Sequence, residues 1–454
     1  MKADLYLHDG LVVTEDGAFH GGVTVKDGKI AQILHGDLAV EAEETIELGG
    51  KALLPGLVDD HAHFNEPGRT EWEGFLTGSM SAAAGGVTTP LEMPLNATPP
   101  TIDRAQLLRK HELASTQCVV DYAFWGGLVH DNLKEIDALH AEGVIGFKSF
   151  MSDAGTDFPR VDDDLLYAGL RKVKQLGNII GLHAENDSIV SYAARQLREA
   201  GRVDRDAWLE SRPPEGELEA IRRALYWAAA ADARLHIVHI SIADGVRAIA
   251  EARRSGTRAT AETCPHYLCL DRDAFVRLGP VAKCAPPIRP RAEVEQLWKC
   301  LLDGMVDTVA SDHSPCPVAD KERGNDNIWE AWGGVTGIQT MLPAILTEGV
   351  HKRGLTLPHL VRLMSANPAR IFGVYPKKGA LLPGSDADMV IVDLDEEWTL
   401  SADQMFSKHK HCPYVGMHFK GQVERTIVRG TTVYQDGEIL VKPGFGKLVR
   451  RLAA

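Results

Sequence analysis

The sequence predicts an α/β protein, with a parallel (β/α)8 barrel of the TIM type joined to a small β-sandwich domain built from both chain ends. Three observations predict this fold class. The middle of the chain alternates apolar strands with amphipathic helical stretches eight times. Both ends instead alternate short β-branched runs with Asp-Gly and Gly-Gly turns. At 454 residues, the chain is long enough for one barrel and one smaller domain.

The two chain ends share a hairpin pattern. Residues 4–34 show it first, and it returns at residues 386–394 and 421–441. We therefore expect residues 1–53 and 376–454 to form one small β domain, and residues 54–375 to form the barrel.

The barrel strands are expected from eight apolar runs, at residues 57–64, 86–94, 119–128, 144–150, 178–185, 234–241, 258–265 and 306–313. Nearly continuous apolar character is typical of parallel strands that helices cover. Charged amphipathic segments such as residues 131–143 and 162–177 lie between them and end in glycine, as helices often do. Active sites in this fold lie at the carboxyl ends of the strands.

Six metal-binding or charged side chains lie at the carboxyl ends of five of these strands: His61, His63, Lys148, His183, His239 and Asp312. Taken singly, each has a structural interpretation. A buried histidine is usually a hydrogen-bonded core residue, and Asp312 also suits a helix N-cap. Together, four imidazoles and a carboxylate are too many for one tetrahedral zinc with an open position, and they favour two metal ions.

Lys148 belongs to this set for a chemical reason. Two neighbouring cations need an anionic bridge, whereas a lysine ammonium is a cation without an acceptor. A lone lysine at a strand end usually reaches for water, but Lys148 lies in an apolar run without a second charge. Carboxylation by carbon dioxide would turn it into an anion with two oxygens, which predicts an N6-carboxylysine bridge.

Three further histidines are left out of the predicted centre. His236 lies three residues before His239, so strand alternation is expected to turn it to the opposite face. His313 is excluded by the same argument, because it neighbours Asp312. His266 is expected to have a supporting or structural role.

Composition excludes several classes of protein. A net charge of −14 without a basic block argues against nucleic acid as a partner. No apolar run is long enough for a membrane span, and no signal peptide is recognisable at the N-terminus. The seven cysteines are scattered and contain no C-x-x-C pair, which favours reduced thiols and a cytoplasmic protein.

The sequence resembles the cyclic-amidase branch of the amidohydrolase superfamily, which holds allantoinases, dihydropyrimidinases (hydantoinases) and dihydroorotases. The resemblance covers nearly the whole chain and includes "PGLVDDHAHF", "GFKSF", "HAEN", "HIVHIS", "ETCPHYL", "CAPPIR", "SDHSPC" and "NPARIFG". It implies that the six strand-end residues hold two divalent metal ions bridged by carboxylated Lys148. Zinc is the expected metal, with cobalt, manganese and nickel as alternatives.

Within this branch, "NEPGRTEWEGF", "NIWEAWGGVTGIQT" and "CPYVG" are similar to allantoinase sequences. Dihydroorotases carry an arginine where this chain has Asn65, and hydantoinases usually carry a tyrosine where it has Asp153. Relatives often have serine where this chain has Ala285. The alternatives are a hydantoinase or dihydropyrimidinase, then a dihydroorotase, and remotely a non-catalytic scaffold related to dihydropyrimidinases.

The resemblance also implies a mechanism. A hydroxide bridging the metals attacks a ring carbonyl of allantoin, and Asp312 accepts the proton of the water and passes it to the departing nitrogen, giving allantoate. Expected substrate contacts are Asn65, Ala285, Thr336 and Gly337. A homo-oligomer, by resemblance a tetramer, is expected.

Overall fold

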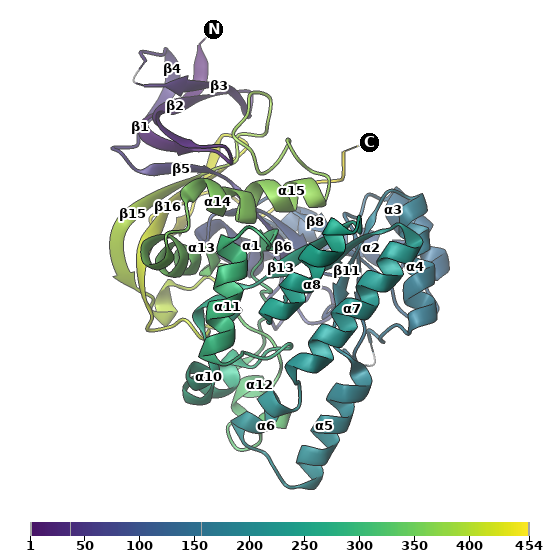
Figure 1. The fold of residues 1–454 in the computed structure, drawn as a ribbon. Helices are drawn as coiled ribbons and strands as arrows, with labels where there is room; N and C mark the ends of the chain where they lie inside the picture. Colours follow the sequence, from purple (N-terminus) through teal and green to yellow (C-terminus); the bar gives the residue numbers. More distant parts are fainter. Residues whose placement is uncertain (1, 37, 156, 453–454) are drawn as a thin grey trace.

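The computed structural model describes residues 2–36, 38–155 and 157–452, and its centre is a parallel barrel (Figure 1). Every one of the eight predicted strand segments contains a barrel strand, and every strand is shorter than its predicted segment. The strands are β6 (Leu57–Ala62), β7 (Val87–Glu92), β8 (Ala123–Phe124) continued by β9 (Gly126–Gly127), β10 (Phe147–Phe150), β11 (Ile179–His183), β12 (Arg234–Ile237), β13 (Ala259–Thr263) and β14 (Thr308–Val309).

Hydrogen bonds order these strands as β6-β7-β8 and β9-β10-β11-β12-β13-β14. The barrel closes where Ala62 pairs in parallel with His313, and the His63 amide donates to the His313 carbonyl at 2.7 Å. This closure places the end of the first strand beside the end of the last. Strand ends that are 250 residues apart in the chain therefore meet at one mouth.

Helices surround the barrel and bury its outer face. They include α1 (Phe75–Ala84), α2 (Arg104–Gln117), α3 (Ile136–Ala141), α4 (Asp163–Gln175), α7 (Pro214–Ala231), α8 (Ala243–Arg254), α11 (Arg291–Leu302), α13 (Met341–Ile345), α14 (Leu357–Val361) and α15 (Asn367–Ile371). The expected helices within 131–143 and 162–177 are present as α3 and α4. None of the helices in the described part of the chain is both long and apolar enough to cross a membrane.

An excursion after β11 departs from the simple alternation of strand and helix. Its helices are α5 (Asp187–Glu199) and α6 (Arg205–Glu210), which project on the side of the molecule away from strands β1 to β4 (Figure 1). Shorter segments after β13 and β14 lie near it: α10 (Arg272–Leu278), α12 (Val318–Glu322) and the single turn η3 (Ile328–Glu330). The short helix α9 (Pro265–Cys269) instead packs against α11 and α13.

The small domain draws on both chain ends, as predicted. Its sheet has nine strands in the order β18-β17-β16-β15-β5-β1-β2-β3, with β4 also paired to β1. The strands are β1 (Ala3–Val13), β2 (Ala18–Lys26), β3 (Lys29–His35), β4 (Ala42–Glu47), β5 (Ala52–Pro55), β15 (Met389–Thr399), β16 (His418–Val428), β17 (Thr431–Gln435) and β18 (Glu438–Ile439). The predicted fold class is confirmed.

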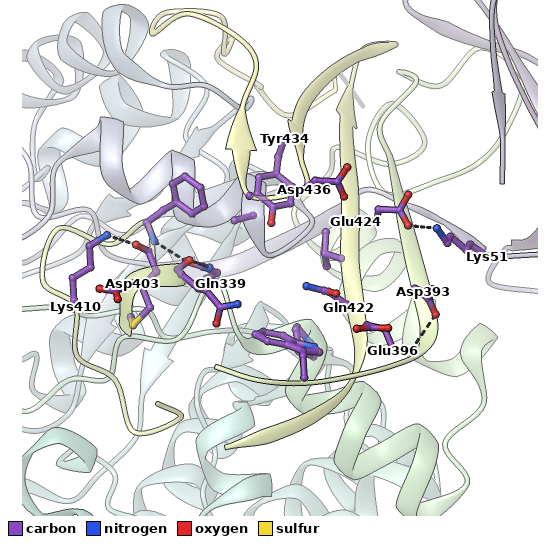
Figure 2. A pocket seen from close by; sticks show the side chains of 18 residues that line it. Lys51, Gln339, Asp393, Glu396, Asp403, Lys410, Gln422, Glu424, Tyr434 and Asp436 are labelled. Carbon is purple, nitrogen blue, oxygen red and sulfur yellow. Dashed lines mark hydrogen bonds and ion pairs between the residues drawn. The ribbon is translucent and has the colours of Figure 1, made fainter. Parts of the chain in front are cut away.

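Two features mark the junction of the small domain and the barrel. Lys378, fully buried, binds Asp121 of the barrel at 2.5 Å and Asp388 at 2.7 Å. Strands β15 to β17 also border a cavity of about 950 Å³, where Lys51 pairs with Glu424 (Figure 2). This cavity shares no lining residue with the pocket at the strand ends.

Candidate metal centre

The six strand-end side chains predicted as ligands meet at the mouth of the barrel. The Nε2 atoms of His61 and His63 lie 3.3 and 3.5 Å from the same Asp312 oxygen. Lys148 Nζ lies 3.4 Å from His61 Nε2, and His183 Nδ1 lies 2.9 Å from His239 Nε2. All six line one pocket of about 220 Å³. The closed barrel brings these side chains together. His61 and His63 lie at the end of the same strand, β6, and the other four lie in or shortly after four other strands.

Two carboxylates that the sequence analysis did not identify bind the ring nitrogens of His61 and His183 that point away from the pocket. Glu262 on β13 binds His61 Nδ1 at 2.8 Å and also accepts from the His239 amide at 2.8 Å. Glu185, two residues after β11, binds His183 Nε2 at 2.7 Å. A histidine whose rear nitrogen is bound to a carboxylate presents the other nitrogen in a fixed direction, as metal-ligating histidines do.

Glu262→Gln is therefore expected to reduce metal affinity or turnover by about 10- to 100-fold, because the amide cannot fix His61 as the carboxylate does. Metal content and steady-state turnover measure the effect. Glu73→Gln is the matched control: Glu73 is also buried, but its carboxylate accepts the Lys408 amide and lies 3.9 Å from Nε2 of His313, which is not one of the six predicted ligands. Equal loss in both variants would contradict a positioning role for Glu262.

Backbone conformation turns two of the predicted ligands inward. His239 and Asp312 have φ angles of 39° and 43°, a left-handed conformation that is uncommon for residues other than glycine. Both follow the ends of very short strands, β12 and β14. The chain therefore leaves the strand geometry before it reaches them, and strand alternation no longer decides where their side chains point.

The prediction that His236 faces away from the centre is wrong for this reason. His236 shares its barrel row with Lys148, because the register pairs Lys148 with Gly181 and Gly181 with His236. Its Nε2 binds Glu262 at 3.1 Å. His236 thus lies in the barrel interior, and a single carboxylate links it to His61.

The other two excluded histidines, His313 and His266, lie outside the pocket. His313 accepts the Gly337 amide at 3.2 Å on Nδ1 and packs edge-on against Phe64. His266 is buried, and neither of its ring nitrogens has a hydrogen-bond partner among the described residues. Neither residue lines the pocket.

Burial makes three imidazoles of this site, those of His63, His183 and His239, suitable as ligands. It lowers the pKa of His63 to about 4, and it also lowers the pKa values of His183 and His239. At neutral pH these side chains are therefore uncharged, which is the form that binds metal ions.

The surroundings lower the pKa values of both Asp312 and Lys148. Burial alone would raise the pKa of Asp312, but His61, His63 and His239 outweigh it and hold the pKa well below its ordinary value. Burial lowers the pKa of Lys148 to about 8. Asp312 is consequently an ionised acceptor, and an appreciable part of Lys148 is the neutral amine.

The residues fit the metal ions that the family resemblance implies. One ligand atom each of His61, His63 and Asp312 lies within 4.8 Å of the others, and all three residues are buried. Imidazole nitrogen and carboxylate oxygen are the donors that zinc and its neighbours prefer. The donor set and its convergence thus suit a metal centre.

Of the four predicted substrate contacts, one lines the pocket. Ala285 does so, together with Asn96, Arg212, Gly333 and Gly334. Asn65, with a φ of 63°, donates to the Pro315 carbonyl at 3.1 Å, and Gly337 donates to His313. Asn65, Thr336 and Gly337 are not among the lining residues, so their assignment stays a prediction.

Comparisons of the sequence and of the structure with known proteins all find amidohydrolases. The model of the Amidohydrolase family matches residues 52–433. The chain is 45% identical to an allantoinase of Solibacter usitatus, covering 99% of this chain and 97% of that one, and 46% identical to an allantoinase of Rubrobacter xylanophilus, covering 98% and 97%. The solved L-hydantoinase (dihydropyrimidinase) of Arthrobacter aurescens has a TM-score of 0.97 and 41% identity, covering 99% of this chain and 100% of that one.

Proposed function

The chain belongs to the amidohydrolase family, and on that premise we propose that it hydrolyses the cyclic amide of allantoin to allantoate. The observation that carries the proposal is the similarity, over nearly the whole chain, to allantoinases at 45 and 46% identity. The meeting of six metal-type ligands in one buried pocket supports it, because hydrolysis of an unactivated amide needs a strong nucleophile.

In this proposal His61, His63, Lys148, His183, His239 and Asp312 hold two divalent metal ions, with zinc expected and cobalt, manganese or nickel as alternatives. Bound metal would supply a water of lowered pKa and polarise the carbonyl to be attacked. Glu262 and Glu185 orient His61 and His183 from behind.

Asp312 is the proposed general base and general acid. It lies at the pocket, where a carboxylate can reach both the attacking water and the ring nitrogen. Because its pKa is held low, it is ionised when it takes the water proton and acidic when it gives that proton to the departing nitrogen. The ring C–N bond then breaks, with a carboxylate on carbon and hydrogen on nitrogen.

Lys148 is the proposed site of carboxylation. Its neutral amine attacks carbon dioxide, forms an N–C bond and loses a proton, which yields an N6-carboxylysine anion. Full burial favours this reaction, because it lowers the pKa of Lys148 to about 8 and so increases the fraction of free amine.

Substrate comparison tests the proposal. The metal-loaded enzyme is expected to hydrolyse allantoin with a kcat/KM at least about tenfold above its values for hydantoin and dihydrouracil, as followed by release of the ring-opened acids. A second candidate substrate is a hydantoin, favoured by the TM-score of 0.97 to the L-hydantoinase. Faster turnover of hydantoin than of allantoin would transfer the assignment to that candidate, and treatment with a chelator should abolish either activity.

Three narrower points belong to the same proposal. We place Asn65, Ala285, Thr336 and Gly337 at the substrate, although only Ala285 lines the pocket. We also place the enzyme in the cytoplasm and expect it to assemble as a homotetramer.

A further inference from the structure

A second pocket, of about 410 Å³, adjoins the candidate metal centre. The two pockets share Ser152, Asp153, Trp208 and Arg212 as lining residues. We call the second pocket the vestibule and define it by its charged and aromatic wall: Arg195, Arg198, Trp208, Arg212 and Trp329. The excursion after β11 forms most of its wall, with Arg195 and Arg198 on α5 and Trp208 on α6. The turn η3, which follows β14, adds Trp329.

The vestibule contains two arginines that are free to meet a ligand. Within the described parts of the chain, neither Arg195 nor Arg198 has an ion-pair partner, whereas Arg212 pairs with Glu185. The acidic lining residues are Asp153, Asp187 and Glu199. Asp187 already faces Arg160 at 3.3 Å, and Glu199 accepts from Gln196 at 3.2 Å. Asp153 is exposed and accepts from the Gly155 amide at 3.0 Å.

The aromatic part of the wall is held in place by the backbone. Trp208 Nε1 donates to the Cys284 carbonyl at 2.9 Å, and Trp329 Nε1 donates to the Arg202 carbonyl at 2.8 Å. Arg198 lies over the Trp329 ring at 4.6 Å, and Arg212 lies over the Trp208 ring at 4.7 Å. Each guanidinium is thus presented on an oriented aromatic face.

We propose that the vestibule is a carboxylate-binding site that receives the ring-opened product on its way out of the catalytic pocket. The inference rests on the proposed function. Allantoin is a neutral ring at pH 7, whereas hydrolysis creates a carboxylate and a second planar ureido group. Guanidinium groups bind carboxylates through paired hydrogen bonds.

The shared residue Arg212 explains how the product could be transferred. It lines both pockets, and its Nε is buried without a hydrogen-bond partner in the described residues. A carboxylate formed beside the metal centre can therefore contact Arg212 first and Arg198 next. The neutral substrate has no carboxylate to bind these arginines, so the vestibule binds product more tightly than substrate. The enzyme is therefore subject to product inhibition.

Calorimetric titration of allantoate into metal-loaded enzyme tests the proposal. The Arg195→Gln/Arg198→Gln double variant is expected to bind allantoate about tenfold more weakly, because it lacks both guanidinium charges. The inhibition constant of allantoate against allantoin turnover should rise by the same factor. The matched control is Arg171→Gln, another exposed arginine beside an aromatic ring, Tyr167, but outside the vestibule. Its affinity for allantoate should equal that of the unmodified enzyme.

Two results would overturn the vestibule: undetectable binding of allantoate to the unmodified enzyme, or equal affinity in the double variant and the control. Failure of the proposed function looks different, because allantoin would then not be hydrolysed by unmodified enzyme. Allantoate binding is measured in the absence of turnover. The binding result therefore tests the vestibule, and the hydrolysis assay tests the proposed function.

Discussion

Replacing Asp312 by asparagine is expected to lower the kcat for allantoin by about 10³-fold while metal stays bound. Asparagine keeps an oxygen that can serve as a ligand, but it neither accepts the proton of the attacking water nor delivers one to the ring nitrogen. The loss should appear in kcat more than in KM, because proton transfer stabilises the transition state and not the bound substrate.

Metal content, measured beside kcat, separates the two roles of Asp312. Asp307→Asn is the matched control: it lies just before the same strand β14, outside the pocket, and accepts the Ala261 amide at 2.7 Å. That variant should keep its metal and its kcat, with a cost only in stability. Unchanged turnover in Asp312→Asn would remove Asp312 from the acid–base role.

Lys148→Ala is expected to lose most of its bound metal and at least about 10³-fold in turnover. The physical reason is that two neighbouring cations require an anion between them, and in this proposal only the carboxylated side chain supplies it. The truncated side chain leaves space, so added acetate or propionate should restore part of the metal and part of the activity.

Lys110→Ala provides the comparison for Lys148→Ala. Lys110 is also fully buried, but it pairs with Glu92 and is not a lining residue of the metal pocket. Its loss should lower stability, while folded protein keeps its metal and gains nothing from added carboxylate. A Lys148→Ala protein with full metal content and full turnover would eliminate the carbamate bridge.

Much of the fold and of the candidate site was predictable from local pattern. The eight strands are recognisable because parallel barrel strands are apolar throughout, and the small domain because turn residues recur at both ends. The six strand-end residues were found by one rule, that a barrel presents its chemistry at the carboxyl ends of strands. Applied to the glutamates as well as to Asp312, the histidines and Lys148, the same rule would have drawn attention to Glu262 and Glu185, which lie within the predicted strands 258–265 and 178–185.

What the sequence by itself determined is the set of elements and the chemical types at their ends, because periodicity and side-chain chemistry are local properties. Tertiary structure alone decided which side chains touch. His236 faces the interior through its register in β12, and His239 can share that interior because β12 ends early and His239 adopts a left-handed conformation. The vestibule arose because the excursion after β11 folds Arg198 against Trp329, across 131 residues of chain. Such contacts depend on closure of the barrel and packing of its loops, which no local pattern encodes.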